Sequence, residues 1–151
     1  MGAGIGLASL RLAHDYPQAE IWSVDVEPIS VLERLDQPTN VINFGGHTFS
    51  EFCERYVEGA VPPMELVYIL FPTPAEVEDY CRIASQILAR QGFIHVITDS
   101  GFFIREAYRF WENAGLIARW AVVPDLFRGL SELSHDFDLG THACWLVARR
   151  G

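Results

Sequence analysis

The chain has 151 residues, half of them hydrophobic, which indicates one domain over residues 1–151 with a core of ordinary size. Eleven basic residues, all of them arginines, stand against 20 aspartates and glutamates, so the formal net charge is -9. This balance opposes the counterion release that drives sequence-independent binding to DNA or RNA, and we do not expect nucleic acid as a partner.

The sequence shows no signal for a membrane or for secretion. Its longest apolar run, residues 66–71, is far too short to span a bilayer, and no basic segment followed by an apolar one stands at the N-terminus. Cys53, Cys81 and Cys144 form no C-x-x-C pair, which favours free thiols over disulfides or zinc ligands. We expect a cytoplasmic protein.

The chain opens on a glycine-rich stretch, residues 1–6, which leads into a helical pattern that ends near Asp15. Residues 20–25 alternate and are rich in β-formers, so they predict a strand ending in Asp25. Pro28 suits the first turn of a second helix, and residues 40–44 predict a short strand closed by two glycines.

A third helix is predicted from Thr48, because Glu51 three residues later completes a capping box. The continuous apolar run 66–71 is typical of a strand covered on both faces in the middle of a parallel sheet. Thr73 then caps a long helix, with Pro74 in its first turn. Its predicted reciprocal cap is Glu76 and its predicted end is Gly92.

The last third of the chain predicts a strand at 93–98, a helix that Ser100 caps and Gly115 ends, and strands at 116–123 and 142–148. No clear helix joins the final two strands, so we expect them to pair antiparallel. The order of elements predicts an α/β domain: a doubly wound, mostly parallel sheet with helices on both faces and an antiparallel last strand.

In such a sheet, ligands bind beyond the carboxyl ends of the strands. The free N–H groups of a glycine loop at a helix start favour a carboxylate or phosphate, and Asp25 is placed to accept hydrogen bonds from both hydroxyls of a ribose. The structural alternative is that the glycines form an ordinary turn and that Asp25 is a cap.

Four segments together resemble class I S-adenosylmethionine-dependent methyltransferases over nearly the whole chain: GAGIG at 2–6, SVDVEP at 23–28, YILFP at 68–72 and GFIHVITD at 92–99. The resemblance implies that the first strand of that fold is missing, since no residues precede the glycine loop. It also implies S-adenosylmethionine as cofactor, held by the glycine loop, the acid that ends the second strand and the loops after later strands. The residues so assigned are Gly2, Ala3, Gly4, Gly6, Asp25, Val26, Gly46, His47 and Phe71.

The segment Phe71-Pro72-Thr73-Pro74, followed by a strand ending in Thr-Asp, also resembles tRNA guanine methyltransferases, in which an acid stands where this chain has Thr73. The resemblance places Pro72 and Thr73 on the substrate side. His47 has the alternative role of an exposed residue at a helix start.

Methyl transfer needs alignment of donor and acceptor more than a general base, so a catalytic residue is hard to name. Asp99 is a weak candidate, with helix capping as its alternative. His135, Asp136, Asp138 and His142 match no ligand spacing, and we predict a solvated loop and no metal. Phe102, Phe103, Trp111 and Trp120 are predicted mainly as core residues.

The leading hypothesis is a methyltransferase that acts on a small molecule. Its alternatives are a truncated or degenerate member of the fold with a structural or partner-binding role, and a tRNA guanine methyltransferase. A missing central strand leaves two unpaired edges, which are bridged directly, left open or filled by another chain, so that a homo-oligomer is one expectation.

Overall fold

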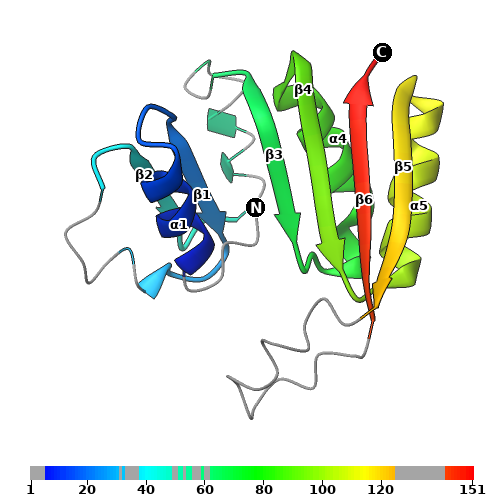
Figure 1. Cartoon of the computed structure of the whole chain (residues 1–151), viewed down its shortest axis with the longest axis horizontal. Coiled ribbons are helices and arrows are strands. Elements are labelled where there is room, and N and C mark those ends of the chain that lie inside the picture. The colour runs from blue at the N-terminus through cyan, green and yellow to red at the C-terminus, as the bar shows by residue number, and fades with distance from the viewer. Residues whose placement is uncertain are drawn as a thin grey trace. The chain divides into compact units, whose positions relative to one another are not determined.

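The computed structural model describes residues 6–30, 32, 38–48, 51–52, 54–55, 59, 62–124 and 142–151 (Figure 1). Two compact units divide the chain, Met1–Pro62 and Pro63–Gly151, and each is described by itself. A single domain over residues 1–151 therefore stays a prediction.

The first unit contains helix α1 (Leu7–Asp15) and strands β1 (Ile21–Asp25) and β2 (Val41–Gly45). The two strands pair in parallel, from Ile21 opposite Val41 to Asp25 opposite Gly45. A buried hydrogen bond of 2.7 Å joins the hydroxyls of Ser9 and Ser23, and so ties α1 to β1. The helix predicted to end near Asp15 and the strands predicted at residues 20–25 and 40–44 are confirmed.

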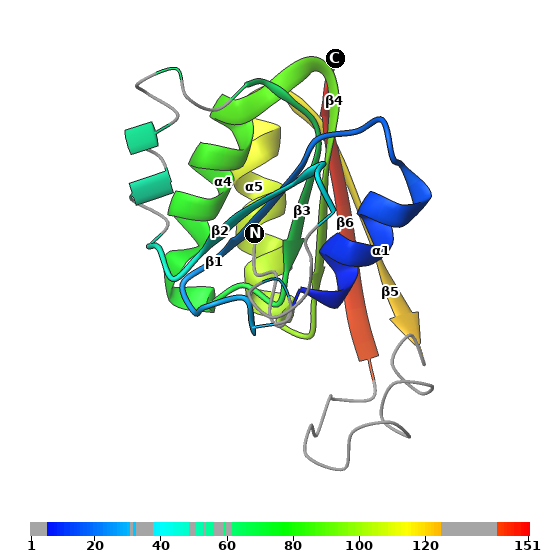
Figure 2. The ribbon, with the colours of Figure 1, turned by 90° about the vertical axis from the view of Figure 1, so that its left-hand side faces the viewer.

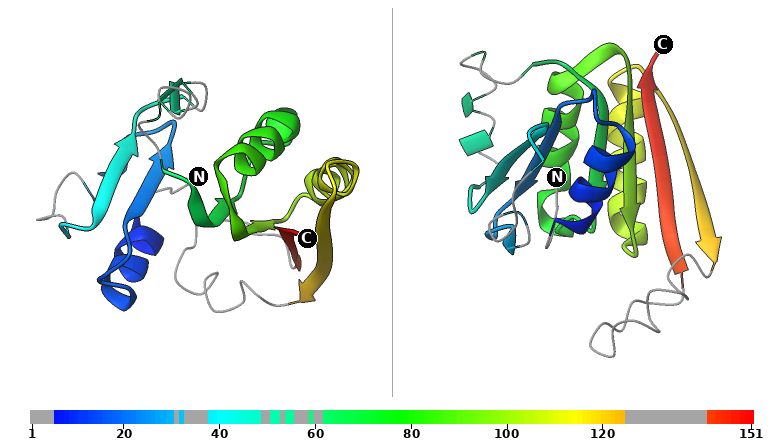
Figure 3. Two further views of the ribbon diagram at one scale, coloured as in Figure 1. Left: turned by 90° about the horizontal axis from the view of Figure 1, so that it is seen from above. Right: turned by 60° about the vertical axis from the view of Figure 1, so that its left-hand side comes forward.

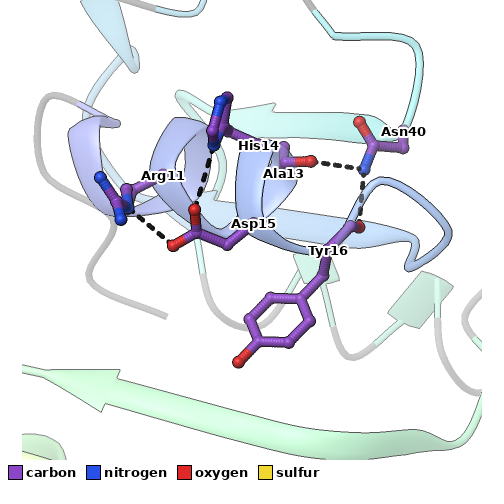
Figure 4. Close-up of polar contacts among 6 residues, drawn as sticks. All are labelled: Arg11, Ala13, His14, Asp15, Tyr16 and Asn40. Carbon is purple, nitrogen blue, oxygen red and sulfur yellow. Dashed lines mark hydrogen bonds and ion pairs between the residues drawn. The ribbon is translucent and has the colours of Figure 1, made fainter.

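Asn40 fastens the end of α1 to the start of β2. Its side-chain amide lies 3.3 Å from the carbonyl oxygens of Ala13 and Tyr16 (Figure 4). The same amide lies 3.0 Å from the carbonyl oxygen of Ala19. The carbonyl of Ala13 belongs to the last turn of α1, where carbonyls lack partners within the helix, and those of Tyr16 and Ala19 lie in the connection that follows. One side chain thus orders the whole connection between helix and strand.

The second unit is a four-stranded sheet with the order β3-β4-β6-β5 (Figure 1). Strand β3 (Met64–Leu70) runs parallel to β4 (Leu88–Thr98), and β6 (His142–Arg150) runs antiparallel to both β4 and β5 (Leu116–Pro124). The predicted antiparallel pairing of the last two strands is confirmed. Within this sheet, however, β3 stands at the end of the order rather than in the middle.

Helices α4 (Val77–Ile87) and α5 (Gly101–Asn113) cover the same face of this sheet (Figures 2 and 3). The indole N–H of Trp111 on α5 donates to the carbonyl of Cys81 on α4 over 3.2 Å, and Tyr80 meets Phe103 edge to face at 6.1 Å. Both helices bury their apolar faces against each other and the sheet, as the helical spacing of their apolar residues predicts.

Two predicted helix caps have different outcomes. Ser100 caps α5, because its hydroxyl accepts from the N–H of Phe103 at 3.2 Å, and Gly115 follows the helix with a φ of 77°. Thr73 makes no side-chain cap bond, and a 3-10 turn, Pro74–Glu76, precedes α4. There the backbone carbonyl of Thr73 accepts from Glu76 instead, so the predicted reciprocal cap is wrong.

Gly92 does not end α4, because the helix stops at Ile87 and Gly92 lies buried within β4. A Cβ at this position would lie 2.9 Å from the carbonyl oxygens of Met64 and Glu65 on the neighbouring strand. The pairing of β3 with β4 shifts register here. Glycine is therefore required by the close approach of a strand rather than by a helix end.

Two of the four aromatics predicted as core residues are exposed. Phe103 and Trp111 are fully buried, whereas Phe102 and Trp120 are 50% and 55% exposed. Among the described residues, no helix has both the length and the apolar character needed to cross a bilayer. In the same part of the chain, no group of three or more His, Cys, Asp and Glu side chains is placed to hold a metal ion, and residues 135, 136 and 138 lie outside it.

Replacing Gly92 by alanine tests the close approach of β3. We expect Gly92→Ala to lower the free energy of unfolding by about 1–3 kcal/mol, the usual cost of overpacking. Gly101→Ala is the matched control, since a Cβ there meets open space at the start of α5, and it should be neutral or slightly stabilising. Urea unfolding measures both, and equal losses would contradict the geometry.

Cys81 should be chemically inert in the folded protein. Burial, with a smaller contribution from the charge of Glu78, raises the pKa of its thiol to about 12, so about one thiol in 10⁴ is ionised at pH 8. We expect Cys81→Ser to leave the rate of native thiol labelling by a disulfide reagent unchanged and to remove one labelled thiol in denaturant. If the native protein shows a fast labelling phase that Cys81→Ser lacks, the thiol of Cys81 is accessible and the prediction is wrong.

Candidate functional site

In the first unit, the carboxyl ends of β1 and β2 lie together. The N–H of Gly46 donates to the carbonyl of Glu27 over 3.0 Å, and the N–H of His47 donates to the carbonyl of Asp25 over 3.4 Å. Parallel pairing brings both strand ends to one edge, as expected for a doubly wound sheet. Asp25, Gly46 and His47, which the sequence nominates separately, are therefore neighbours.

Asp25 is half-buried at this edge, and its Oδ1 accepts from the N–H of Glu27 at 3.0 Å. This local bond turns the chain directly after β1 and orients the carboxylate. The bond is a local turn and not a helix cap, and the cofactor role of Asp25 stays a prediction. Val26, the next predicted residue, is exposed.

Ile29 links the glycine loop to the end of β2. Its side chain is fully buried, and Cβ atoms at Gly6 and at Gly45 would lie 2.6 Å and 2.7 Å from it. Gly6 stands at the start of α1 with a left-handed φ of 93°. Sequence reasoning missed Ile29, for which the only signal was an apolar residue directly after Pro28.

Gly46, directly after β2, faces open space. Its φ is 77°, and a Cβ at this position would meet nothing within 4 Å. A backbone of this kind permits close approach of a ligand. Gly2, Ala3 and Gly4, the remaining residues of the predicted glycine loop, lie outside the described residues.

His47 stands over Phe44, with ring centroids 4.4 Å apart, and its Nδ1 is 3.8 Å from a carboxylate oxygen of Glu51. The capping box is confirmed: Glu51 accepts from the N–H of Thr48 at 2.6 Å, and the Thr48 hydroxyl accepts from the N–H of Glu51 at 3.3 Å. The backbone N–H of Thr48 is the main cause that lowers the pKa of Glu51. A hollow of 410 Å³ is lined by Phe44, His47, Glu51, Glu54 and Arg55.

In the second unit, the carboxyl ends of β3 and β4 lie together because the N–H of Phe71 donates to the carbonyl of Ile97 over 2.9 Å. Phe71 is exposed and has a φ of 48°, which is rare for a residue with a side chain and costs on the order of 1–3 kcal/mol. Pro72 is buried and Thr73 is exposed. Sequence reasoning gave no signal for the left-handed backbone of Phe71.

Asp99 follows β4 and is exposed. Capping of α5 falls to Ser100, whose own N–H donates to the buried hydroxyl of Thr98 at 3.1 Å. The alternative role of Asp99 as the helix cap is therefore wrong. Its catalytic role stays a prediction.

Several solved structures with the same fold are named as methyltransferases. A precorrin-6y C5,15-methyltransferase from Geobacter metallireducens superposes over 100% of this chain and 77% of its own, with a TM-score of 0.72 and 15% identity. Fibrillarin, a pre-rRNA processing protein from Methanococcus jannaschii, has the same TM-score, 13% identity and coverages of 100% and 65%.

A plantazolicin methyltransferase in complex with a triazolic desmethylPZN analog and SAH superposes over 99% of this chain and 74% of its own, with a TM-score of 0.67 and 10% identity. No protein-family model and no curated protein matches the sequence. The chain therefore has the class I methyltransferase fold, and the α/β class predicted from the sequence is confirmed.

Substitution of Gly45 tests the packing behind this edge. A Cβ at Gly45 would lie 2.7 Å from the backbone nitrogen of Ile29, which cannot move aside as a side chain does, so Gly45→Ala should cost toward the upper end of about 1–3 kcal/mol. Gly46→Ala, in open space, should cost about 1 kcal/mol from its positive φ alone. Urea unfolding that ranks Gly46→Ala as the more damaging change would refute the packing.

Proposed function

We propose that this protein is an S-adenosylmethionine-dependent methyltransferase that acts on a small molecule. The observation that carries the proposal is the cluster at the ends of β1 and β2, where the half-buried Asp25 adjoins the left-handed Gly46 in a chain with the methyltransferase fold. A carboxylate beside open backbone suits a ligand that offers paired hydroxyls and a flat ring. SAH is bound by one of the structural neighbours.

In this proposal, Gly6 and the preceding Gly2, Ala3 and Gly4 approach the methionyl end of the cofactor. Asp25 accepts hydrogen bonds from the ribose hydroxyls, with Val26 beside it. Gly46 and His47 border the adenine, where the ring of His47, held over Phe44, offers a flat surface. Phe71 is also proposed as a cofactor residue, and Pro72 and Thr73 are proposed as residues for the methyl acceptor.

The cofactor supplies a methyl group on a sulfonium, which an aligned nucleophile attacks in line. The chain then has to bind and orient, and no strong base is obligatory. Asp99, exposed after β4, is the residue proposed to orient the acceptor or take its proton. A reducing cytoplasm is the proposed location.

A small molecule is the preferred acceptor because the chain is strongly acidic, with a net charge of -9. The neighbours include proteins named for precorrin and plantazolicin, as well as a fibrillarin and an rRNA methylase. An RNA acceptor, and a structural role without catalysis, are the two alternatives. Binding of the cofactor would distinguish a methyltransferase from a protein with only a structural role. Methyl transfer to a tRNA substrate would identify RNA as the acceptor.

Calorimetric titration with S-adenosylhomocysteine tests the site. We expect binding by the unaltered chain and affinity at least about tenfold lower in Asp25→Ala, because hydrogen bonds to a charged group contribute about 1.5–3 kcal/mol. Glu20→Ala removes an equal charge just before the opposite end of the same strand and should leave the affinity unchanged.

Two results would overturn the proposal. Absence of binding at millimolar ligand removes the cofactor and leaves the structural role. Equal affinity of Asp25→Ala and the unaltered chain removes Asp25 from the site.

A further inference from the structure

The hollow in the first unit is bordered by two stacked rings, Phe44 and His47, which we call the aromatic wall. Their centroids lie 4.4 Å apart, with 34° between the ring planes. Phe44 in turn meets Phe52 edge to face at 5.6 Å, and Phe52 is only 1% exposed. A ring that packs on a buried ring has little freedom to move. The aromatic wall is therefore a prepared surface on which a flat ring can stack.

The backbone connects the aromatic wall to Asp25. The N–H of His47 donates to the carbonyl of Asp25 over 3.4 Å, and Gly46 between β2 and His47 faces open space. The hollow thus adjoins the residue proposed for the ribose. Its volume of 410 Å³ falls within the roughly 300–1,000 Å³ that is usual for small-molecule sites. A base joined to that ribose can therefore reach the hollow.

Glu51 holds a carboxylate at the hollow in one position. Its Oε2 accepts from the N–H of Thr48 at 2.6 Å and from the Thr48 hydroxyl at 3.0 Å, and it lies 3.8 Å from Nδ1 of His47. The backbone N–H of Thr48 is the main cause that lowers the pKa of this carboxyl, which keeps it ionised. Among the described residues all these contacts use Oε2, so Oε1 keeps its capacity to accept a hydrogen bond. An acceptor is thus in place before any ligand binds.

The charged groups at the hollow offer more acceptors than donors. Glu51 and Glu54 contribute two carboxylates, and Arg55 contributes one guanidinium. Within the part of the chain that the structure describes, Arg55 forms no ion pair with them. Carboxylates accept from N–H groups and repel carbonyl oxygens. Adenine offers a matching edge, with its N6 amino donor beside the N7 acceptor, whereas guanine and hypoxanthine carry an O6 acceptor at that place.

We propose that Glu51 makes the cofactor site specific for adenine by accepting a hydrogen bond from the N6 amino group. The base stacks on the aromatic wall, and Arg55 donates to a ring nitrogen beside that amino group. This inference rests on the proposed function, because it requires that the base of S-adenosylmethionine enters the hollow. Glu51 is not among the site residues nominated from the sequence, where it has only the role of a helix cap.

The test compares two ligands by calorimetric titration of the full chain. They are S-adenosylhomocysteine and S-inosylhomocysteine, in which an O6 carbonyl replaces the N6 amino group. The test variant is Glu51→Gln, which keeps the capping box because the amide oxygen also accepts from Thr48, and which places an amide NH₂ group where Oε1 stood. The control, Glu20→Gln, makes the same change just before the start of β1, at the end opposite Asp25.

We expect the unaltered chain to bind S-adenosylhomocysteine at least about tenfold more tightly than S-inosylhomocysteine, the usual effect of one hydrogen bond to a charged group. In Glu51→Gln this ratio should fall to about one or reverse, because an amide NH₂ group donates to O6 and not to N6. Glu20→Gln should keep the ratio of the unaltered chain. The ratio reports the choice of base, because a general loss of folded protein lowers the binding of both ligands alike.

Two outcomes would overturn this inference and leave the proposed function standing. One is equal affinity of the unaltered chain for the two ligands, and the other is a ratio in Glu51→Gln as large as that of the unaltered chain. Absence of any binding of S-adenosylhomocysteine at millimolar concentration overturns the proposed function, and the inference with it. The comparison on the unaltered chain needs no variant, so it decides the matter even if Glu51→Gln does not fold.

Discussion

The second unit depends on the burial of one side of β4 beneath α4 and α5. Ile94, Val96 and Thr98 are at most 1% exposed, and they alternate with residues that point the other way. Because a shift by one residue would exchange the two faces of a strand, this burial fixes the register of β3 and β6 against β4. It thereby decides where the ends of β3 and β4 stand.

In the first unit, a single buried side chain has the comparable role. Ile29 touches the start of α1 through Gly6 and the end of β2 through Gly45, so larger residues at either glycine would collide with it. The cluster of Asp25, Gly46 and His47 is therefore supported from behind by packing rather than by charge. Support of this kind is what a binding site on strand ends requires.

The two proposals meet at the end of β2 but rest on different observations. The proposed cofactor site is polar and lies at strand ends, and solved methyltransferases of the same fold support the proposal. The role of Glu51 rests on the capping box and the aromatic wall of this chain alone. Binding of the cofactor and the choice of its base are separate properties, and each is open to its own measurement.

The sequence by itself determined most elements, the capping box at Thr48, the Ser100 cap and the antiparallel last strands, because local spacing and turn chemistry set these. It also nominated Asp25, Gly46 and His47, since strand ends are readable from apolar runs. Tertiary structure alone decided that Gly92 lies within a strand, that Phe71 is left-handed and that Ile29 joins two elements. These features arise from contacts between segments distant in sequence, which no local pattern records. The position of β3 at the end of its sheet follows from pairing partners, and those are likewise a property of the folded chain.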